Sequence, residues 1–205
     1  MKTKPIAKST RRKPTQIRAR LTVDAILDAV VRLLKRKGHK AITTNRIAEV
    51  AGVSIGSVYQ YFPNKHAIFI ALHERHVSEI DRMIHSKLTQ HAASPLDVLV
   101  RAIVDGMIEA HAPDPGLYQL LQTEVPHRAD GTRDFALRLE GAFRLALSSH
   151  RDEVTITANL DTIVFIVANM IDALSHSVLL RCPRSLSLPK AKEAVTEAIL
   201  AYLRG

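Results

Sequence analysis

The sequence is poor in cysteine and in aromatic residues. It contains one cysteine, Cys182, no tryptophan, and an aromatic content of only 4%. A single thiol excludes a framework of internal disulfides and is typical of proteins kept in a reducing compartment. The hydrophobic content is nevertheless 46%. This balance favours a helical protein whose core is built from Leu, Ile, Val and Ala.

Long hydrophobic runs without polar interruptions are also missing. The most apolar segment, residues 160–180, is interrupted by Asp161, Asn169, Asp172 and His176, among other polar residues. It is therefore not expected to span a membrane. The basic residues 1–20 lack the apolar centre of a secretion signal. We expect a cytoplasmic protein that does not contact a membrane.

Acidic residues are scarce in the first third of the chain. Residues 1–67 contain 15 Lys and Arg against three Asp and Glu, whereas residues 68–205 contain 14 against 17. This segregation favours a nucleic-acid-binding N-terminal part, because clustered basic residues neutralise phosphates and release counterions. A solubilising surface would explain the net charge of +9 but not its uneven placement.

The basic residues begin in a distinct N-terminal segment. Residues 1–20 contain eight Lys or Arg, two prolines and no acidic residue, which predicts a disordered basic arm. The arm could follow DNA phosphates or enter the minor groove. It could equally be a solvated tail that adds only nonspecific attraction.

Hydrophobic periodicity and helix punctuation predict an all-α fold of about nine helices. The first helix is expected to begin at a Thr22 cap and to end at Gly38. Thr44 is expected to cap a second helix, and Asn64 a long one after Pro63. Further helices are expected over residues 95–112, 115–124, 134–149, 160–181 and 189–203.

Residues 43–65 carry the most informative pattern. Small and apolar side chains recur where two crossing helices would touch, and Gly52 supplies a positive-φ corner between them. Ser54 can cap the second of these helices. The other face of that helix carries short or hydrogen-bonding groups suited to a DNA groove, namely Ile55, Gly56, Ser57, Tyr59 and Gln60. The pattern predicts a helix-turn-helix that binds DNA.

Residues 22–72 resemble the TetR/AcrR (tetracycline-repressor) family of transcriptional regulators. The residues that carry the resemblance are Ile26-Leu27-Asp28-Ala29, Gly38, Thr43-Thr44, Ile47-Ala48, Ala51-Gly52-Val53-Ser54, Gly56 and Tyr59-x-Tyr61-Phe62-x-x-Lys65. Residues 94–205 match only in helical layout. The resemblance implies an N-terminal three-helix DNA-binding domain over residues 21–66. A helical ligand-binding and dimerisation domain would follow over residues 67–205.

The resemblance also implies a homodimer whose N-terminal domains bind the two half-sites of a palindromic operator in double-stranded DNA. The implied DNA-binding residues are Thr43, Thr44, Asn45, Ser54, Ile55, Gly56, Ser57, Tyr59, Gln60, Tyr61 and Lys65. Within this set Thr43, Thr44 and Lys65 would contact phosphate, and Asn45 could pair with adenine. Either Tyr59 or Tyr61 could instead be a packing residue.

The second half is expected to hold both the dimer contact and a ligand cavity. The family usually pairs its last two long helices across a twofold axis, here residues 160–181 and 189–203. Phe165, Asn169, Asp172 and His176 share one helical face by spacing. They would line the cavity or hydrogen-bond across the dimer interface, and we favour the interface. The other implied cavity residues are His73, Met107, His111, Tyr118, Phe135, Leu139 and Phe143.

The resulting hypothesis is a repressor that leaves its operator when a small, largely apolar inducer binds. An activator, a regulator without a ligand and a nonspecific architectural DNA-binding protein stay open as alternatives. No nucleophile motif or phosphate loop is present, so no catalytic residue, enzyme activity or cofactor is expected. His73 and His76 could chelate a metal with a third ligand, but no metal site is expected.

Overall fold

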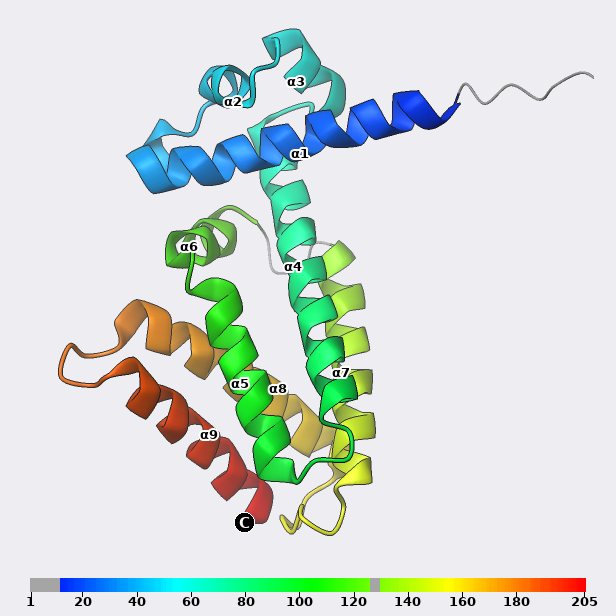
Figure 1. Ribbon diagram of the computed structural model, residues 1–205, viewed down its shortest axis with the longest axis vertical. Coiled ribbons are helices and arrows are strands. Elements are labelled where there is room, and N and C mark those ends of the chain that lie inside the picture. Colours follow the sequence, from blue (N-terminus) through cyan, green and yellow to red (C-terminus); the bar gives the residue numbers. More distant parts are fainter. Residues whose placement is uncertain (1–11, 126–129) are drawn as a thin grey trace, which may run out of the picture. The chain divides into compact units, whose positions relative to one another are not determined.

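A computed structural model describes residues 12–125 and 130–205, and within these ranges the ordered elements are all helical (Figure 1). The elements are α1 Arg12–Lys37, the 3-10 helix η1 His39–Ala41, α2 Thr44–Ala51, α3 Ile55–Tyr61, α4 Lys65–Gln90, α5 Leu96–His111, α6 Pro115–Glu124, α7 Asp130–Ser149, α8 Leu160–Arg181 and α9 Leu188–Arg204. The predicted all-α fold is confirmed. The chain forms two compact units, one up to Ala71 and one from Leu72. The domain limits inferred above stay a prediction.

The first unit is built on the buried faces of α1, α2 and α3. Ile26, Ile47 and Val58, one from each helix, are all fully buried. Gly52 ends α2 with φ of 70°, the left-handed conformation that glycine adopts without strain. Ser54 then caps α3 by accepting a hydrogen bond of 3.0 Å from the backbone N–H of Ser57. The predicted helix, glycine corner and capped second helix are confirmed.

Two predicted helix starts in this unit are wrong. The first helix begins at Arg12 rather than at a Thr22 cap, so residues 12–20 are helical instead of disordered. This stretch is rich in Arg, Lys, Gln and Ala, which favour helix, and a proline is tolerated in a first turn. The Thr22 hydroxyl donates instead to the carbonyl of Arg18, one turn back. Residues 1–11 lie outside the described residues.

The second wrong start concerns α2, which Thr43 rather than Thr44 caps. Thr43 has an extended backbone, and its hydroxyl accepts a 3.3 Å hydrogen bond from the N–H of Arg46. Thr44 is already the first helical residue, so its side chain is left for other contacts. At α4 the prediction is confirmed, because Asn64 accepts a 2.9 Å hydrogen bond from the N–H of Ala67.

The second unit is a helical bundle in which α5 packs against α8 and α9, α8 packs against α9, and α7 also packs against α8 (Figure 1). Its core is formed by apolar side chains from α4, α5 and α7 to α9, with Ile163, Ile199 and Leu203 completely buried. Arg138 of α7 donates to the carboxylate of Asp81 on α4 at 3.2 Å and ties these helices together. The bundle therefore places the inner faces of α4, α5, α7 and α8 around a common interior.

Helix α8 is unusual because it is apolar on most of its circumference. Among the described helices it alone is long and apolar enough to cross a membrane by length and composition. That test is weak, because a core helix of a water-soluble protein also passes it. Ile163, Val167 and Ile171 of α8 are buried in the core of the second unit. Phe165 on the opposite side is 57% exposed.

Candidate nucleic-acid interface and ligand cavity

Helix α3 has one buried and one exposed face. Val58 anchors the helix with no exposed surface, whereas Ile55 is 39% and Tyr59 is 52% exposed. Gly56 and Gln60 are exposed beside them. Large apolar side chains are rarely clustered on a solvent-exposed surface unless they contact a partner. The short helix thus presents a mixed apolar and hydrogen-bonding surface that the fold itself does not use.

The start of α2 lies next to this surface. Oγ1 of Thr44 lies 3.4 Å from Oη of Tyr59, so the contact joins the first residue of α2 to the exposed face of α3. Thr43 and Asn45 on either side are exposed. The structure therefore brings together residues that are 15 positions apart in sequence. It also shows that the Tyr59 ring is displayed rather than packed in the core.

The remaining predicted DNA-binding residues are half-buried or capping groups. Ser54 and Ser57 share a hydroxyl contact of 2.8 Å at the start of α3. Tyr61 is half-buried, which fits the packing alternative for this residue better than for Tyr59. The ammonium group of Lys65 lies 5.2 Å from the centre of the Phe69 ring, a cation–π contact that holds its stem. None of the eleven predicted residues is fully buried.

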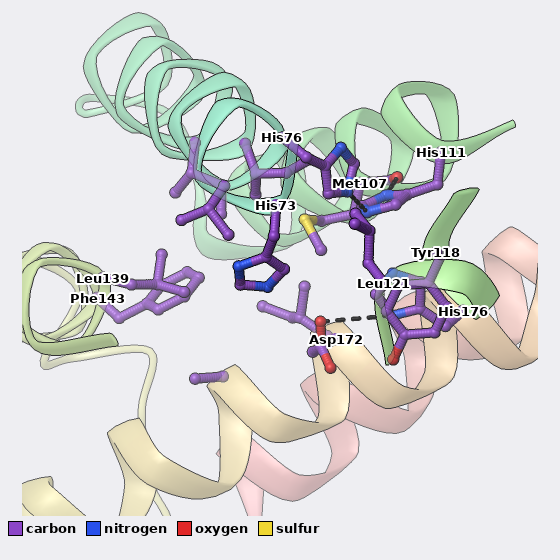
Figure 2. Close-up of a pocket in the computed structure, with 15 residues that line it drawn as sticks. His73, His76, Met107, His111, Tyr118, Leu121, Leu139, Phe143, Asp172 and His176 are labelled. Carbon is purple, nitrogen blue, oxygen red and sulfur yellow. Dashed lines mark hydrogen bonds and ion pairs between the residues drawn. The ribbon is translucent and has the colours of Figure 1, made fainter. Parts of the chain in front are cut away.

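A cavity of about 200 Å³ lies inside the second unit (Figure 2). The predicted residues that line it are His73, Met107, His111, Tyr118, Leu139, Phe143, Asp172 and His176. Sequence reasoning missed His76, Val77, Ile80, Ile84, Leu121, Ala168 and Ile171. The spacing of His76, Ile80 and Ile84 along α4 from His73 was a signal that could have found those three.

Two predicted cavity residues that the structure describes, Phe165 and Asn169, are not among those that line it. Phe165 is exposed, and the side-chain amide of Asn169 donates at 2.7 Å to the Phe165 carbonyl within its own helix. The shared helical face is therefore divided, with only Asp172 and His176 at the cavity. The side chain of Phe135 lies outside the described residues.

The cavity has an apolar end and a polar end. Figure 2 shows Leu139 and Phe143 on one side and His76, His111, Tyr118 and His176 on the other. His73 and Asp172 lie between the two groups. Such a division suits a ligand with an apolar body and one polar group.

The polar end is a chain of imidazoles in direct contact. Nδ1 of His111 lies 2.7 Å from the carbonyl oxygen of Met107, which can only accept, so Nδ1 carries the proton. Nε2 of His111 is then the acceptor for Nε2–H of His76 at 3.0 Å. Burial, together with the neighbouring histidines, lowers the pKa of His76 to about 4. Burial also lowers the pKa of His111, so these two rings are neutral at pH 7.

His176 closes the chain. Its ring stacks on Tyr118 with centroids 3.4 Å apart and meets the His111 ring edge-on at 4.4 Å. Nδ1 of His176 lies 3.3 Å from Oδ1 of Asp172, within ion-pair distance, yet neither ring nitrogen has an aligned hydrogen-bond partner. In the part of the chain that the structure describes, no three His, Cys, Asp or Glu residues are arranged to hold a metal ion.

A helix-turn-helix with a displayed second helix, followed by a helical unit with an internal cavity, defines a class of ligand-responsive DNA-binding regulators. Residues 26–72 match the family described as bacterial regulatory proteins, tetR family. Residues 95–203, more than half of the chain, match the tetracyclin repressor-like C-terminal domain. The chain belongs to the TetR family of transcriptional regulators. Members of this family are ligand-responsive DNA-binding proteins and often repressors, and the family and fold are not those of enzymes.

Individual relatives agree with this assignment. The chain is 33% identical over 97 residues to the nucleoid occlusion factor SlmA of Haemophilus ducreyi, covering 47% of each chain. It is 26% identical to the transcriptional regulator AcrR of Shigella flexneri, covering 66% of this chain and 62% of AcrR. The matched region thus spans about half the length of the curated SlmA relatives.

Solved structures share the fold. The transcriptional regulator FadR of Bacillus subtilis, determined in complex with stearoyl-CoA, superposes with a TM-score of 0.68. The sequence identity is 18%, and the match covers 87% of this chain and 98% of FadR. At this level of identity the likeness establishes the architecture of both units.

Proposed function

We propose that this protein is a cytoplasmic transcriptional repressor that binds a palindromic operator as a homodimer and leaves it when a small, largely apolar inducer enters the cavity. The observation that carries the proposal is the exposed face of α3. Ile55, Gly56 and Tyr59 stand out from a helix that Val58 fixes in the core. In helix-turn-helix proteins the second helix enters the major groove, where such side chains meet base edges.

Charge supports the same proposal. Most of the excess of basic residues within residues 1–67 precedes this helix-turn-helix in sequence and would supply affinity for DNA phosphates of any sequence. The exposed Asn45 and Tyr59 would then supply discrimination between sequences, since an asparagine amide can pair with the adenine edge. Lys65 and Thr43 would fix the register of the domain on the duplex.

The inducer would act through α4. This helix begins at Lys65, one of the proposed phosphate contacts, and also supplies His73, His76 and Ile80 to the cavity. A ligand that binds one arrangement of α4 more tightly than another shifts the protein toward that arrangement. Release follows if the favoured arrangement changes the separation of the two DNA-binding domains in the dimer.

The test is selection of bound duplexes from a random pool, followed by titration of the best sequence with single variants. Asn45→Ala and Tyr59→Ala should lower the ratio of the affinity for the selected sequence to the affinity for a scrambled sequence. The expected loss of discrimination is about 1–3 kcal/mol for each lost base contact. Lys65→Ala should instead weaken binding to all sequences alike. It should also reduce the slope of the logarithm of the binding constant against the logarithm of the salt concentration by about one.

The outcome separates a regulator from an architectural protein. Recovery of a palindromic consensus, lost selectively in Asn45→Ala or Tyr59→Ala, supports the proposal. Equal binding to every duplex at physiological salt contradicts it. An activator would bind the same consensus, and transcription from a promoter that carries it distinguishes repression from activation.

A further inference from the structure

We propose that the cavity selects a small organic cation with an apolar body. The proposal rests on the function above, in which this cavity receives the inducer, and adds the sign of the charge that the inducer carries.

The described residues of the cavity wall carry a negative formal charge. Of the 15 described residues that line the cavity, Asp172 is the one acidic residue, and none is Lys or Arg. The polar end holds histidines, and burial lowers the pKa of both His76 and His111, which therefore add no positive charge at pH 7. Among the described lining residues, an anionic ligand would thus meet the Asp172 carboxylate and no Lys or Arg.

Asp172 is also available to a ligand. Its side chain is 59% exposed, and Nδ1 of His176 lies 3.3 Å from its Oδ1 without hydrogen-bond alignment. A carboxylate can accept several contacts at once, so a cation can approach Asp172 while His176 stays in place. Figure 2 shows Asp172 between the apolar and polar ends of the cavity, where a cationic group would meet it.

The walls complement an apolar cation rather than a hydrated one. Phe143 and Tyr118 contribute aromatic rings from opposite sides, and Leu139 lies beside Phe143 at the apolar end. Ile80 and Ile84 add further apolar surface to the lining. Ring faces attract cations, most strongly where water is excluded. A bare metal ion would leave the apolar end unused, and the described residues contain no ready-made group of three metal ligands.

The size of the space limits the ligand. A cavity of about 200 Å³ is smaller than the roughly 300–1,000 Å³ that pockets for drug-sized molecules occupy. A single substituted ring fits this range. A suitable probe is (4-hydroxyphenyl)trimethylammonium, and 4-tert-butylphenol is its neutral counterpart with nearly the same shape. The anion 4-hydroxybenzenesulfonate completes the set.

The experiment measures binding of the three probes to the full chain without DNA, by titration calorimetry and by the shift of Tm. We expect the cation to bind at least about fivefold more tightly than its neutral counterpart. This ratio corresponds to about 1 kcal/mol, which is the attraction between opposite charges about 4 Å apart in water. The sulfonate should bind most weakly.

Variants assign the preference to one side chain. Asp172→Asn keeps the shape and should bring the ratio of cation to neutral affinity close to one, whereas Asp172→Glu should keep the preference. Asp161→Asn is the matched control, because it removes the same charge from an exposed position of α8 that does not line the cavity. The ratio is the readout, since a purely structural loss would weaken both probes equally.

Several outcomes overturn the proposal. These are equal binding of the cation and the neutral probe, tighter binding of the sulfonate, a preference that survives Asp172→Asn, and no binding of any probe. Saturable Zn²⁺ binding without binding of the organic cation would assign the histidines to a metal and also overturn it. Because no DNA is present, these results are independent of the operator selection that tests the proposed function.

Discussion

Gly56 separates a requirement of the fold from a requirement of DNA binding. A methyl group at this position would meet only Oγ of Ser54, at an ordinary 3.7 Å, so the folded protein has room for it. If the α3 backbone approaches DNA closely at Gly56, however, the same methyl group would collide with the duplex. We predict that Gly56→Ala binds the selected operator at least about tenfold more weakly, a loss of about 1.4 kcal/mol.

The same substitution should not destabilise the protein. Alanine is favoured over glycine in helices by about 0.5–1 kcal/mol, so unfolding by urea should be unchanged or slightly more difficult. Gly52→Ala is the contrasting variant, because its φ of 70° strains any other side chain and should lower stability. If Gly56→Ala bound the operator as tightly as the native protein, DNA would not approach the α3 backbone at Gly56.

Single residues of the site were predictable where a local pattern or the family motif specifies their role. Ser54, Gly52 and Asn64 fall in local cap and turn patterns, and the structure confirms all three. The pairing of His76 with His111 was not predictable, because it joins residues 35 positions apart. Phe165 and Asn169 show the converse limit. Helical spacing shows which residues share one face of a helix, but it does not show which neighbouring element packs against each turn of that face.

Helix α5 depends on a cap from a distant part of the chain. Its N-cap residue, Pro95, offers no side-chain acceptor, and both carboxylate oxygens of Glu153 instead lie 3.1 Å from the backbone N–H of Leu96. A carboxylate also complements the positive end of the helix dipole. We predict that Glu153→Ala lowers the free energy of unfolding by about 1 kcal/mol, measured by urea denaturation.

Glu153→Gln is the control for this cap. It keeps an oxygen acceptor but loses the charge, so its stability should lie between those of the native protein and Glu153→Ala. A variant series in which alanine is as stable as the native residue would show that water caps α5 equally well.

Most helices were predictable from their boundaries, because proline and glycine act locally. Pro115 opens α6 as predicted, and Gly38 ends α1. The start of α1 was missed because the net charge of residues 12–20 suggested disorder, although their intrinsic preference is helical. The Glu153 cap lay beyond sequence reasoning for another reason. It joins residues 57 positions apart and leaves no local pattern.

At the scale of the whole molecule, α8 and α9 carry apolar side chains on exposed surface, such as Phe165, Leu186 and Leu188 in and beside these helices. Leu174 and Val178 of α8 and Ala194 and Ala198 of α9 line an apolar groove between the two helices. Exposed apolar surface of this kind marks association with a partner. The family assignment and the composition of α8 therefore favour the same partner, a second copy of the chain, with small alanine side chains that allow close approach of helices.

The dimer can be tested by placing a charge in this groove. Ala198 is exposed in the single chain, so Ala198→Glu should leave the fold of each subunit and its helical content nearly unchanged. In a twofold dimer the substitution would bury an unpaired carboxylate, at a cost of about 3 kcal/mol or more. We expect the dimer dissociation constant to rise at least about 100-fold by analytical ultracentrifugation, and operator binding to fall with it. Ala110→Glu, an exposed alanine of α5 outside the groove, is the matched control and should stay dimeric. A dimer equally tight in both variants would move the interface away from α8 and α9.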